Sequence, residues 1–195
     1  MSETRAPYGQ AKYQVRLDWG ATGAERIVPG AHVAVVVDVL PSPDGEAIAA
    51  ALAGRDLVVL EGSLRNRSAV ARRILELQEE RGERLMVAIV AAGERTGGRA
   101  GSEVGGSDAH SDAVRFAVED QLGAGAIVDA LIALGIDHTS PEAAVACAAF
   151  EGLRHAAVHL IGASASGAEL VAQGRRPEVR AATEVDASDE VPSVG

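Results

Sequence analysis

Polar side chains that could do chemistry follow three strongly apolar segments of the chain. They are Asp38 in the first segment, Ser63 and Asn66 after the second, and Glu94 and Arg95 after the third. Apolar segments of this kind are typical of buried strands, and open α/β sheets bind ligands in the crevice beyond the carboxyl ends of their strands. The sequence therefore predicts a ligand site at that edge of a sheet.

Asp38 is the candidate residue that most needs a partner. A carboxylate beside a buried strand costs several kcal/mol unless it is paired or bound to a metal. The alternative is that Asp38 caps a helix or pairs with an arginine. Glu119 and Asp120 form a second acidic group. Neighbours on a helix diverge by about 100°, so we expect at most one of them to face the crevice. The alternative is that both lie on a solvated helix face.

The elements that must position these residues alternate between strand and helix. The apolar segments predict strands at 32–40, 57–60 and 85–92, and the intervening patterns predict helices at 46–53 and from about 64 to 81. Further along, we expect helices at 115–134 (interrupted by Gly123 and Gly125, where a close neighbour demands small residues), 141–160 and 168–173, and a strand at 178–185. This order predicts an α/β fold with three α/β/α layers and a largely parallel or mixed sheet.

We expect a single domain over 15–192, with a flexible N-terminus at 1–14 and a loose tail at 193–195. Six of the fourteen residues from Gly93 to Gly106 are glycine. We interpret the stretch at 93–112 as a surface loop and a candidate active-site flap.

Composition limits the class of partner. The chain has 195 residues, 47% of them hydrophobic, and a net charge of −10. That charge repels a phosphate backbone, so we exclude nucleic acid as the main partner. No uninterrupted apolar run reaches the roughly 20 residues that span a bilayer, so we expect no membrane partner. The single cysteine, Cys147, and the absence of a signal peptide favour the cytoplasm.

Several familiar catalytic motifs are absent from the sequence. It has no P-loop, no dinucleotide fingerprint, no GxSxG elbow and no second aspartate two residues after Asp38. His155 and His159 stand one helical turn apart, but no third zinc ligand accompanies them. We therefore interpret both histidines as solvent-facing.

The ordered series of segments resembles the 2-phosphosulfolactate phosphatase family, in particular its actinobacterial branch. The resemblance covers about Val15 to Pro192. The matching pieces are the strand ending in Asp38, the Ser42-Pro43-Asp44-Gly45 turn, the segment from Gly62 to Ala71, Ala91 to Arg95, Glu119 to Ala126, and the C-terminal part from Glu184 to Pro192. Members of that family carry a longer segment after the Asp-bearing strand, so the resemblance implies a shortened form.

The resemblance implies a Mg²⁺-dependent phosphatase with an α/β fold that converts 2-phosphosulfolactate, or a similar small phosphorylated organic acid, to the free acid and phosphate. It implies that Asp38 and one of Glu119 or Asp120 bind the metal. Asn66, Ser63 and the Asp44-Gly45 turn would contact phosphate, and Arg95 would anchor a carboxylate or sulfonate. For catalysis, the resemblance favours Asp38, Asn66 and Arg95, with direct attack by water.

Two other interpretations stay open. One is a catalytically silent family member that binds a small anion or acts as an oligomeric interaction protein. In that case a homodimer could form through the strand at 32–40, taken as an exposed edge. The other is a different cytosolic α/β enzyme that shares only the fold.

Overall fold

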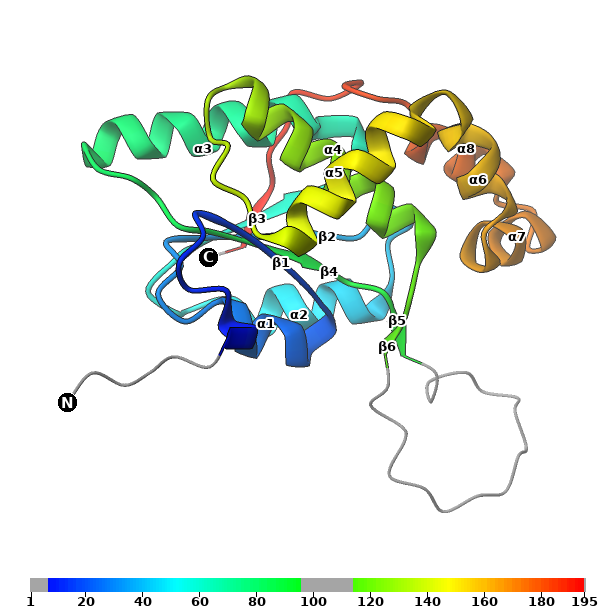
Figure 1. Cartoon of the computed structure of the whole chain (residues 1–195). Helices are drawn as coiled ribbons and strands as arrows, with labels where there is room; N and C mark the ends of the chain where they lie inside the picture. Colours follow the sequence, from blue (N-terminus) through cyan, green and yellow to red (C-terminus); the bar gives the residue numbers. More distant parts are fainter. Residues whose placement is uncertain (1–6, 96–113, 195) are drawn as a thin grey trace, which may run out of the picture.

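A five-stranded sheet forms the centre of the computed structural model, which describes residues 7–95 and 114–194 (Figure 1). The strands follow the order β1-β4-β2-β3-β7, with bounds β1 Val15–Trp19, β4 Val87–Ala91, β2 Val33–Val37, β3 Val58–Gly62 and β7 Ser193–Val194. The first four run parallel, and β7 pairs antiparallel with β3. Two short strands, β5 Glu94–Arg95 and β6 Val114–Arg115, form a separate antiparallel pair.

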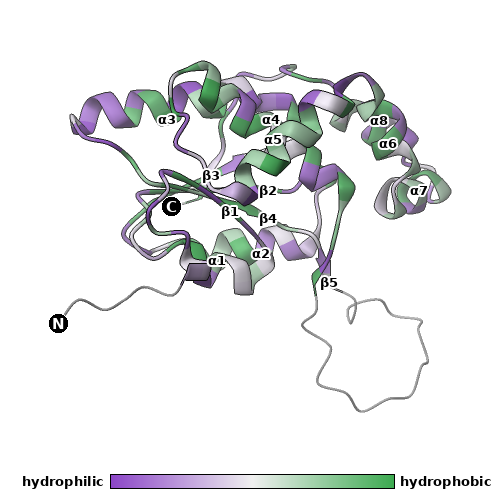
Figure 2. Ribbon diagram, in the orientation of Figure 1, coloured by the Kyte–Doolittle hydropathy of each residue, from purple (hydrophilic) through white to green (hydrophobic). Residues whose placement is uncertain are grey.

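Helices cover both faces of this sheet. On one face lie α1 Gly20–Ile27 and α2 Pro43–Leu52, and on the other α3 Arg67–Arg81, α4 Val118–Ala133 and α5 Pro141–Leu153 (Figure 1). The chain continues through α6 Ala157–Ala163, α7 Ala165–Ala172 and α8 Arg176–Ala182, and its 3-10 turns are η1 Pro7–Gly9, η2 Leu64–Asn66 and η3 Arg154–Ala156. Hydrophobic and hydrophilic residues alternate along α3, as expected for a helix with one buried face (Figure 2). The predicted three-layer α/β/α fold is confirmed.

The central strand β2 is buried on both faces. Val33, Val35 and Val37 join the core under α3, α4 and α5, whereas Ala34 and Val36 join the core over α1 and α2. Strand β2 lies between β4 and β3, so the expectation that the segment at 32–40 is an exposed edge is wrong. The strand also ends at Val37 rather than at residue 40, because the chain turns at Asp38 to enter α2.

The N-terminal part of the chain holds structure that the sequence patterns did not predict. Strand β1 and helix α1 escaped prediction because Arg16 interrupts the apolar pattern of β1. The Arg16 side chain is only 1% exposed. Its guanidinium donates hydrogen bonds to backbone carbonyl groups of the neighbouring turns, at Ala11, Tyr13, Ile27 and Pro29. Residues 7–14, expected to be flexible, are held by these bonds.

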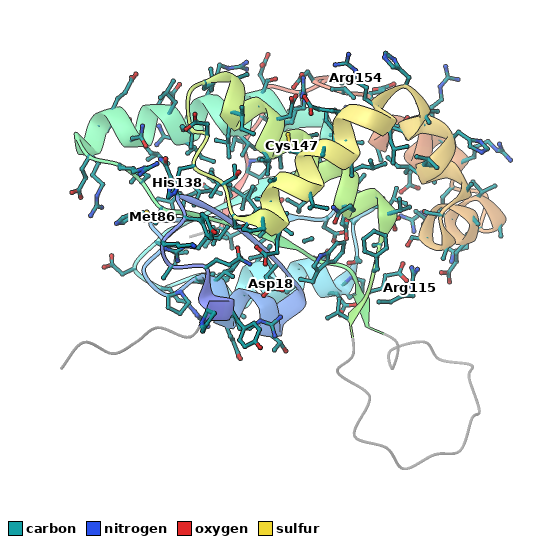
Figure 3. The ribbon with its side chains drawn as sticks, in the orientation of Figure 1. Asp18, Met86, Arg115, His138, Cys147 and Arg154 are labelled. Carbon is teal, nitrogen blue, oxygen red and sulfur yellow. The ribbon has the colours of Figure 1, made fainter. Side chains whose placement is uncertain are left out.

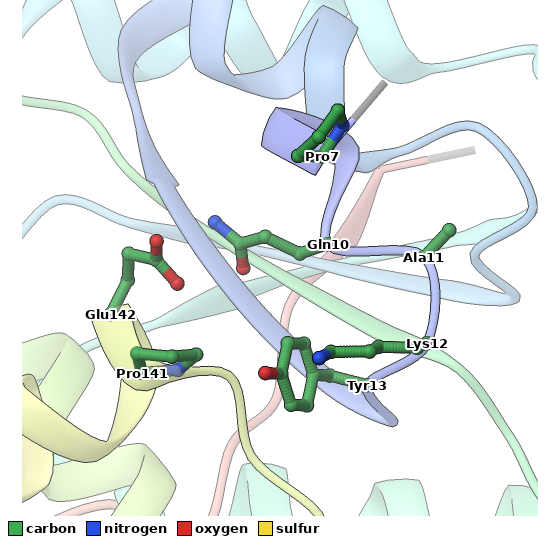
Figure 4. Close-up of a pocket in the computed structure, with 7 residues that line it drawn as sticks. All are labelled: Pro7, Gln10, Ala11, Lys12, Tyr13, Pro141 and Glu142. Carbon is green, nitrogen blue, oxygen red and sulfur yellow. The ribbon is translucent and has the colours of Figure 1, made fainter. Parts of the chain in front are cut away.

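Gln10 closes part of the free edge of β1. Its side-chain amide donates to the Leu17 carbonyl (2.8 Å) and accepts from the Leu17 N–H (3.0 Å), as a neighbouring strand would. Figure 4 shows this side chain lying over the strand. Farther along the same edge, Val15 pairs with the chain at 138–140. Exposed edges invite pairing with other chains, and these contacts prevent it along this part of β1.

The C-terminal part also differs from expectation. The strand predicted at 178–185 is wrong, since the segment forms α8 with Pro177 in its first turn and Val179 and Ala182 buried at helical spacing. Ser193 and Val194 lie in β7 rather than in a loose tail. The helix expected at 141–160 is divided by η3 into α5 and α6.

By length and composition alone, the helical stretch Pro141–Ala163 is apolar enough to cross a membrane, with a mean hydropathy of 1.2. This is weak evidence, because helices that pack against a protein core pass the same test. Here Ala143, Ala146 and Phe150 are buried. The two histidines of this stretch, His155 and His159, are exposed, as predicted.

Helix α4 continues through both of its glycines, so the predicted interruption is wrong but its proposed reason is confirmed. A Cβ atom at Gly125 would lie 2.0 Å from the Ala146 carbonyl oxygen of α5, and one at Gly123 would lie 2.5 Å from a methyl group of Val39. The glycines therefore let α4 approach α5 and the end of β2 closely.

We expect Gly125→Ala to lower the free energy of unfolding by about 2 kcal/mol or more, because the added methyl group forces α4 and α5 apart. Urea unfolding followed by circular dichroism would measure the change. Gly152→Ala in α5 is the matched control, since nothing lies within 4 Å of its Cβ position. That substitution should leave stability unchanged or raise it by up to about 1 kcal/mol. Equal destabilisation by both variants would contradict the close α4–α5 contact.

Candidate functional site

Asp38 directly follows β2 and lies against the first turn of α2. Its Oδ2 accepts hydrogen bonds from the backbone N–H (2.7 Å) and the hydroxyl (3.0 Å) of Ser42. The hydroxyl of Ser42 in turn accepts from the Gly45 N–H and caps the helix. A Cβ atom at Gly45 would lie 2.1 Å from Asp38 Oδ2, so only glycine fits beside this carboxylate. Both hydrogen bonds from Ser42 go to Oδ2, so Oδ1 is the oxygen better placed for a ligand.

Asp120 joins α4 to the ends of two strands. Its side chain is only 2% exposed. Oδ1 accepts from the Val39 N–H (2.9 Å), just after β2, and Oδ2 accepts from the Gly93 N–H (2.9 Å), just after β4. Backbone groups that leave a parallel sheet need partners when they are buried. Asp120 supplies a hydrogen-bond acceptor to the turn after β2 and another to the turn after β4.

Glu119 is buried beside Asp120 but is not satisfied in the same way. It is 3% exposed, and its Oε2 is buried with no hydrogen-bond partner among the residues that the structure describes. The alternative of a solvated helix face is wrong, because both side chains are buried. A buried carboxylate oxygen without a partner costs free energy, so it indicates a place where a ligand would fit.

The three carboxylates act on one another electrostatically. Burial raises the pKa of Asp38 to about 6; the Ser42 hydrogen bonds oppose this rise, and the charges of Glu119 and Asp44 add to it. Burial raises the pKa of Asp120 well above its ordinary value, and the charge of Asp38 raises it further, against the hydrogen bonds from Val39 and Gly93. A divalent cation would relieve this repulsion, and carboxylate oxygens are its usual ligands.

Ser63 and Asn66, expected to contact phosphate, form a local capping box instead. Asn66 Oδ1 accepts from the Ser63 N–H (2.9 Å) and hydroxyl (3.3 Å), and Asn66 Nδ2 donates to the carbonyls of Glu61 (3.1 Å) and Glu190 (3.0 Å). The amide of Asn66 thus has both of its N–H groups occupied. Among the described residues, its contacts hold the C-terminal segment against η2 and reach none of the three carboxylates.

The predicted Asp44-Gly45 turn is the first turn of α2, which begins at Pro43 rather than at residue 46. Gly45 lies against Asp38, and the charge of Asp44 acts on Asp38. The structure therefore brings these two residues to the carboxylate group.

Arg95 lies on β5, where its backbone pairs with Val114, and its side chain falls outside what the structure describes. So do residues 96–112 of the predicted flap. On the neighbouring strand, Arg115 donates to Glu94 Oε2 through Nε (3.1 Å) and Nη2 (2.5 Å), and Ser166 hydrogen-bonds to the other oxygen of Glu94. Figure 3 places Arg115 beside this strand pair.

Sequence reasoning missed Arg115 and Ser166. The available signal for Arg115 was its place four residues before Glu119, although the residue lies on β6 and not in the helix predicted to begin there. The Gly93 N–H donates to Asp120, and Glu94 is the next residue in the sequence. The Glu94–Arg115 pair therefore adjoins a residue that contacts the carboxylate group.

A second group of metal-ligating side chains lies between α4 and α5, formed by Asp129, Cys147 and Glu151. Asp129 is already paired with Arg67 at 2.6 Å. Burial, followed by the charges of Glu151 and Asp129, raises the pKa of the Cys147 thiol to about 11, so it stays protonated. Figure 3 shows Cys147 on α5. This group draws its residues from α4 and α5, and it includes none of Asp38, Glu119 and Asp120.

We expect Asp38→Asn to raise the free energy of unfolding at pH 8, in the absence of metal, by about 1–2 kcal/mol. The folded pKa of Asp38 is raised from 3.8 to about 6, so this group favours the folded state at low pH and loses that contribution as the pH rises through 6. The variant should therefore lose the part of the pH dependence between 4 and 6 that Asp38 causes. Urea unfolding at several pH values measures it. A lower stability of Asp38→Asn at pH 8 would mean that Asp38 serves only as a cap.

Comparison with known protein families assigns the chain to a family. A family model described as 2-phosphosulpholactate phosphatase matches residues 43–195. The match includes Asp44, Gly45, Glu119 and Asp120 and begins just after Asp38. No curated protein matches the chain. The family name implies a phosphatase, a phosphoric monoester hydrolase. Since the family match covers well over half of its length, the chain belongs to the 2-phosphosulpholactate phosphatase family.

Proposed function

We propose that this protein is a Mg²⁺-dependent phosphatase that hydrolyses 2-phosphosulfolactate, or a similar small phosphorylated hydroxy acid, and releases inorganic phosphate. The observation that carries the proposal is the buried, unpartnered Oε2 of Glu119 beside two further carboxylates. Family membership supports the phosphatase activity, and magnesium and the substrate are the proposed part. We also propose that the protein acts in the cytoplasm.

The donor set fits a hard divalent cation. Asp38 and Glu119 would hold the ion, and Asp120 would fix the two turns that present them, because its own oxygens already accept backbone N–H groups. When bound, Mg²⁺ would neutralise the phosphoryl oxygens, orient the attacking water and stabilise charge on the leaving oxygen.

The chain's own residues would supply the remaining contacts. Water would attack phosphorus, the bond from phosphorus to the ester oxygen would break, and the ester oxygen would take up the proton that water loses, so that the free hydroxy acid and inorganic phosphate leave. Asp38, which Ser42 holds just after β2, would help to orient the attacking water. Asp44 and Gly45, in the first turn of α2, would border the phosphate, where backbone N–H groups favour anions.

The second acidic group of the substrate needs a cation in a protein with a net charge of −10. Arg95 and Arg115 stand on the two strands of the β5–β6 pair, next to the carboxylates along the chain. Guanidinium groups suit carboxylate and sulfonate oxygens. We therefore add Arg115 to Arg95 as a proposed anchor.

One observation favours a catalytically silent anion-binding protein as the second candidate. Both N–H groups of the Asn66 amide are used within the fold, so this residue contributes no donor to phosphate. The measurement of phosphate release described next separates the phosphatase from the silent anion-binding protein.

We expect phosphate release from 2-phosphosulfolactate that requires Mg²⁺ and stops with excess chelator. Glu119→Gln should reduce kcat/KM by about 100-fold or more, because it removes a charged ligand. The same substitution should also abolish the rise in melting temperature that Mg²⁺ gives the wild type. Glu178→Gln, in the exposed first turn of α8, is the matched control and should keep both properties.

Absence of phosphate release from folded wild-type protein, together with Mg²⁺-dependent stabilisation, would favour the silent binding protein. Release that persists in excess chelator would contradict the metal-dependent mechanism.

We expect Arg115→Gln to raise KM for 2-phosphosulfolactate at least tenfold, since the substrate loses a charged partner. Hydrolysis of p-nitrophenyl phosphate, which has no second acidic group, should change much less. Steady-state kinetics with both substrates make the comparison. Equal losses on the two substrates would show that Arg115 only maintains the structure.

A further inference from the structure

Ser166 joins helix α7 to the strand pair β5–β6, which carries the two proposed anchors. Its hydroxyl donates a hydrogen bond to Glu94 Oε1, and Arg115 Nη2 donates to the same hydroxyl oxygen at 3.5 Å. Glu94 Oε2 accepts from Nε and Nη2 of Arg115, at 3.1 and 2.5 Å. The three side chains therefore form one network, and Arg115, labelled in Figure 3, lies between the strand pair and α7. Of the three, only Arg115 takes part in the proposed substrate contacts.

A tight corner between α6 and α7 fixes the position of Ser166. Ser164 caps α7 by accepting from the Gly167 N–H (3.0 Å), and its hydroxyl donates to the Ile161 carbonyl of α6 (2.9 Å). A Cβ atom at Gly167 would lie 2.1 Å from that carbonyl oxygen, so the corner requires glycine. Helix α6 packs against α4, and its Ile161 is fully buried in the core. Ser166 is thus held on a scaffold built against α4, the helix that also carries the acidic pair.

The strand pair β5–β6 depends on contacts of this kind, because each of its strands has only two residues. Val114 supplies one such contact. A Cβ atom at Gly20 or at Gly93 would lie 2.4 or 2.5 Å from a methyl group of Val114, so β6 packs closely at the ends of β1 and β4. Arg115 is the next residue, and successive side chains of a strand point to opposite faces. The packing of Val114 therefore leaves the guanidinium of Arg115 to be oriented by other partners.

Glu94 and Ser166 supply this orientation by holding one edge of the guanidinium, formed by Nε and Nη2. Nη1 lies outside that edge and, among the residues that the structure describes, donates only to the Phe116 carbonyl, at 3.3 Å. The Arg115 side chain stays 37% exposed, whereas that of Glu94 is 23% exposed. Nη1 is therefore the nitrogen best placed to meet an acidic group of a ligand. Ser166 is only 9% exposed, so it acts through these two side chains and does not contact the ligand itself.

We propose that Ser166 is a positioning residue for the carboxylate or sulfonate group of the substrate. Its hydroxyl holds Glu94 in place, and Glu94 in turn holds the guanidinium of Arg115 with Nη1 towards the substrate. A charged group binds an anion more tightly when its orientation is already fixed, because less conformational entropy is lost on binding. This inference rests on the proposed function, since it explains how the anchor Arg115 is oriented.

Steady-state kinetics of Ser166→Ala test this role. We expect KM for 2-phosphosulfolactate to rise about three- to tenfold and kcat to change less than about twofold, because the support of the acidic group is lost while the reacting phosphate keeps its contacts. In an Arg115→Gln background the same substitution should raise KM no further, since Ser166 acts through Arg115. Ser166→Thr keeps the hydroxyl and should keep KM within about twofold of the wild type. Ala168→Ser, at an exposed position of α7, is the matched control and should behave as the wild type.

Binding of sulfolactate, the product without phosphate, gives a readout that needs no catalysis. Isothermal titration calorimetry in the presence of Mg²⁺ should show a Kd raised about three- to tenfold in Ser166→Ala and unchanged in Ala168→Ser. Weaker binding by Ser166→Ala would support the inference even in a protein that releases no phosphate, which would contradict the phosphatase alone.

Phosphate release with an unchanged KM in Ser166→Ala would overturn the inference and leave the phosphatase intact. An equal further rise of KM in the Arg115→Gln background would do the same, because it would show that Ser166 does not act through Arg115. So would the loss of folded circular dichroism in Ser166→Ala, or a KM for Ser166→Thr as high as that for Ser166→Ala. A wild type that neither releases phosphate nor binds sulfolactate would overturn both proposals.

Discussion

The carboxylate of Asp120 is the contact on which the arrangement of the site depends. One side chain at the start of α4 accepts hydrogen bonds from the backbone after β2 and from the backbone after β4. These two turns carry Asp38 and the Glu94–Arg115 pair. Because Asp120 holds both, it fixes the distance from the helix to the strand ends, and it brings the neighbouring Glu119 inside. The acidic site is thus a consequence of how α4 is joined to the sheet.

Close helix packing makes this junction feasible. Gly123 and Gly125 let α4 approach Val39 and the Ala146 carbonyl, so the first turn of α4 reaches the strand ends. Gly45 does the same for α2, whose first turn lies against Asp38. The core itself consists largely of aliphatic side chains and alanine, which pack at short range without aromatic rings. Small residues at three helix positions therefore let α2 approach Asp38 closely and let α4 approach Val39 and α5 closely.

Sequence patterns predicted the parts of this fold that depend on burial alone. Strands β2, β3 and β4 follow from continuous apolar runs, and the position of Asp38 at a strand end follows from the first of them. Strand β1 was missed because Arg16 looks like a solvent residue, and its buried state depends on carbonyl groups contributed by later turns. The contact of Asn66 with the Glu190 carbonyl was not predicted, because the two residues are distant in sequence. A pattern shows which residues are apolar, whereas polar partners are set by tertiary contacts.

The carboxylates of the site and the proposed substrate both carry negative charge. An anionic phosphate ester approaching Asp38, Glu119 and Asp120 would meet three carboxylates on a chain with a net charge of −10. Protonation can remove part of that charge, since burial raises the pKa values of Asp38 and Asp120. Protonation does not attract a phosphate. In the proposed function a bound divalent cation would do so, because it would reverse the sign of the local field, and it would also offer a partner to Glu119 Oε2. The negative charge of these carboxylates, which destabilises the folded chain without a cation, is therefore the same charge that would bind the metal.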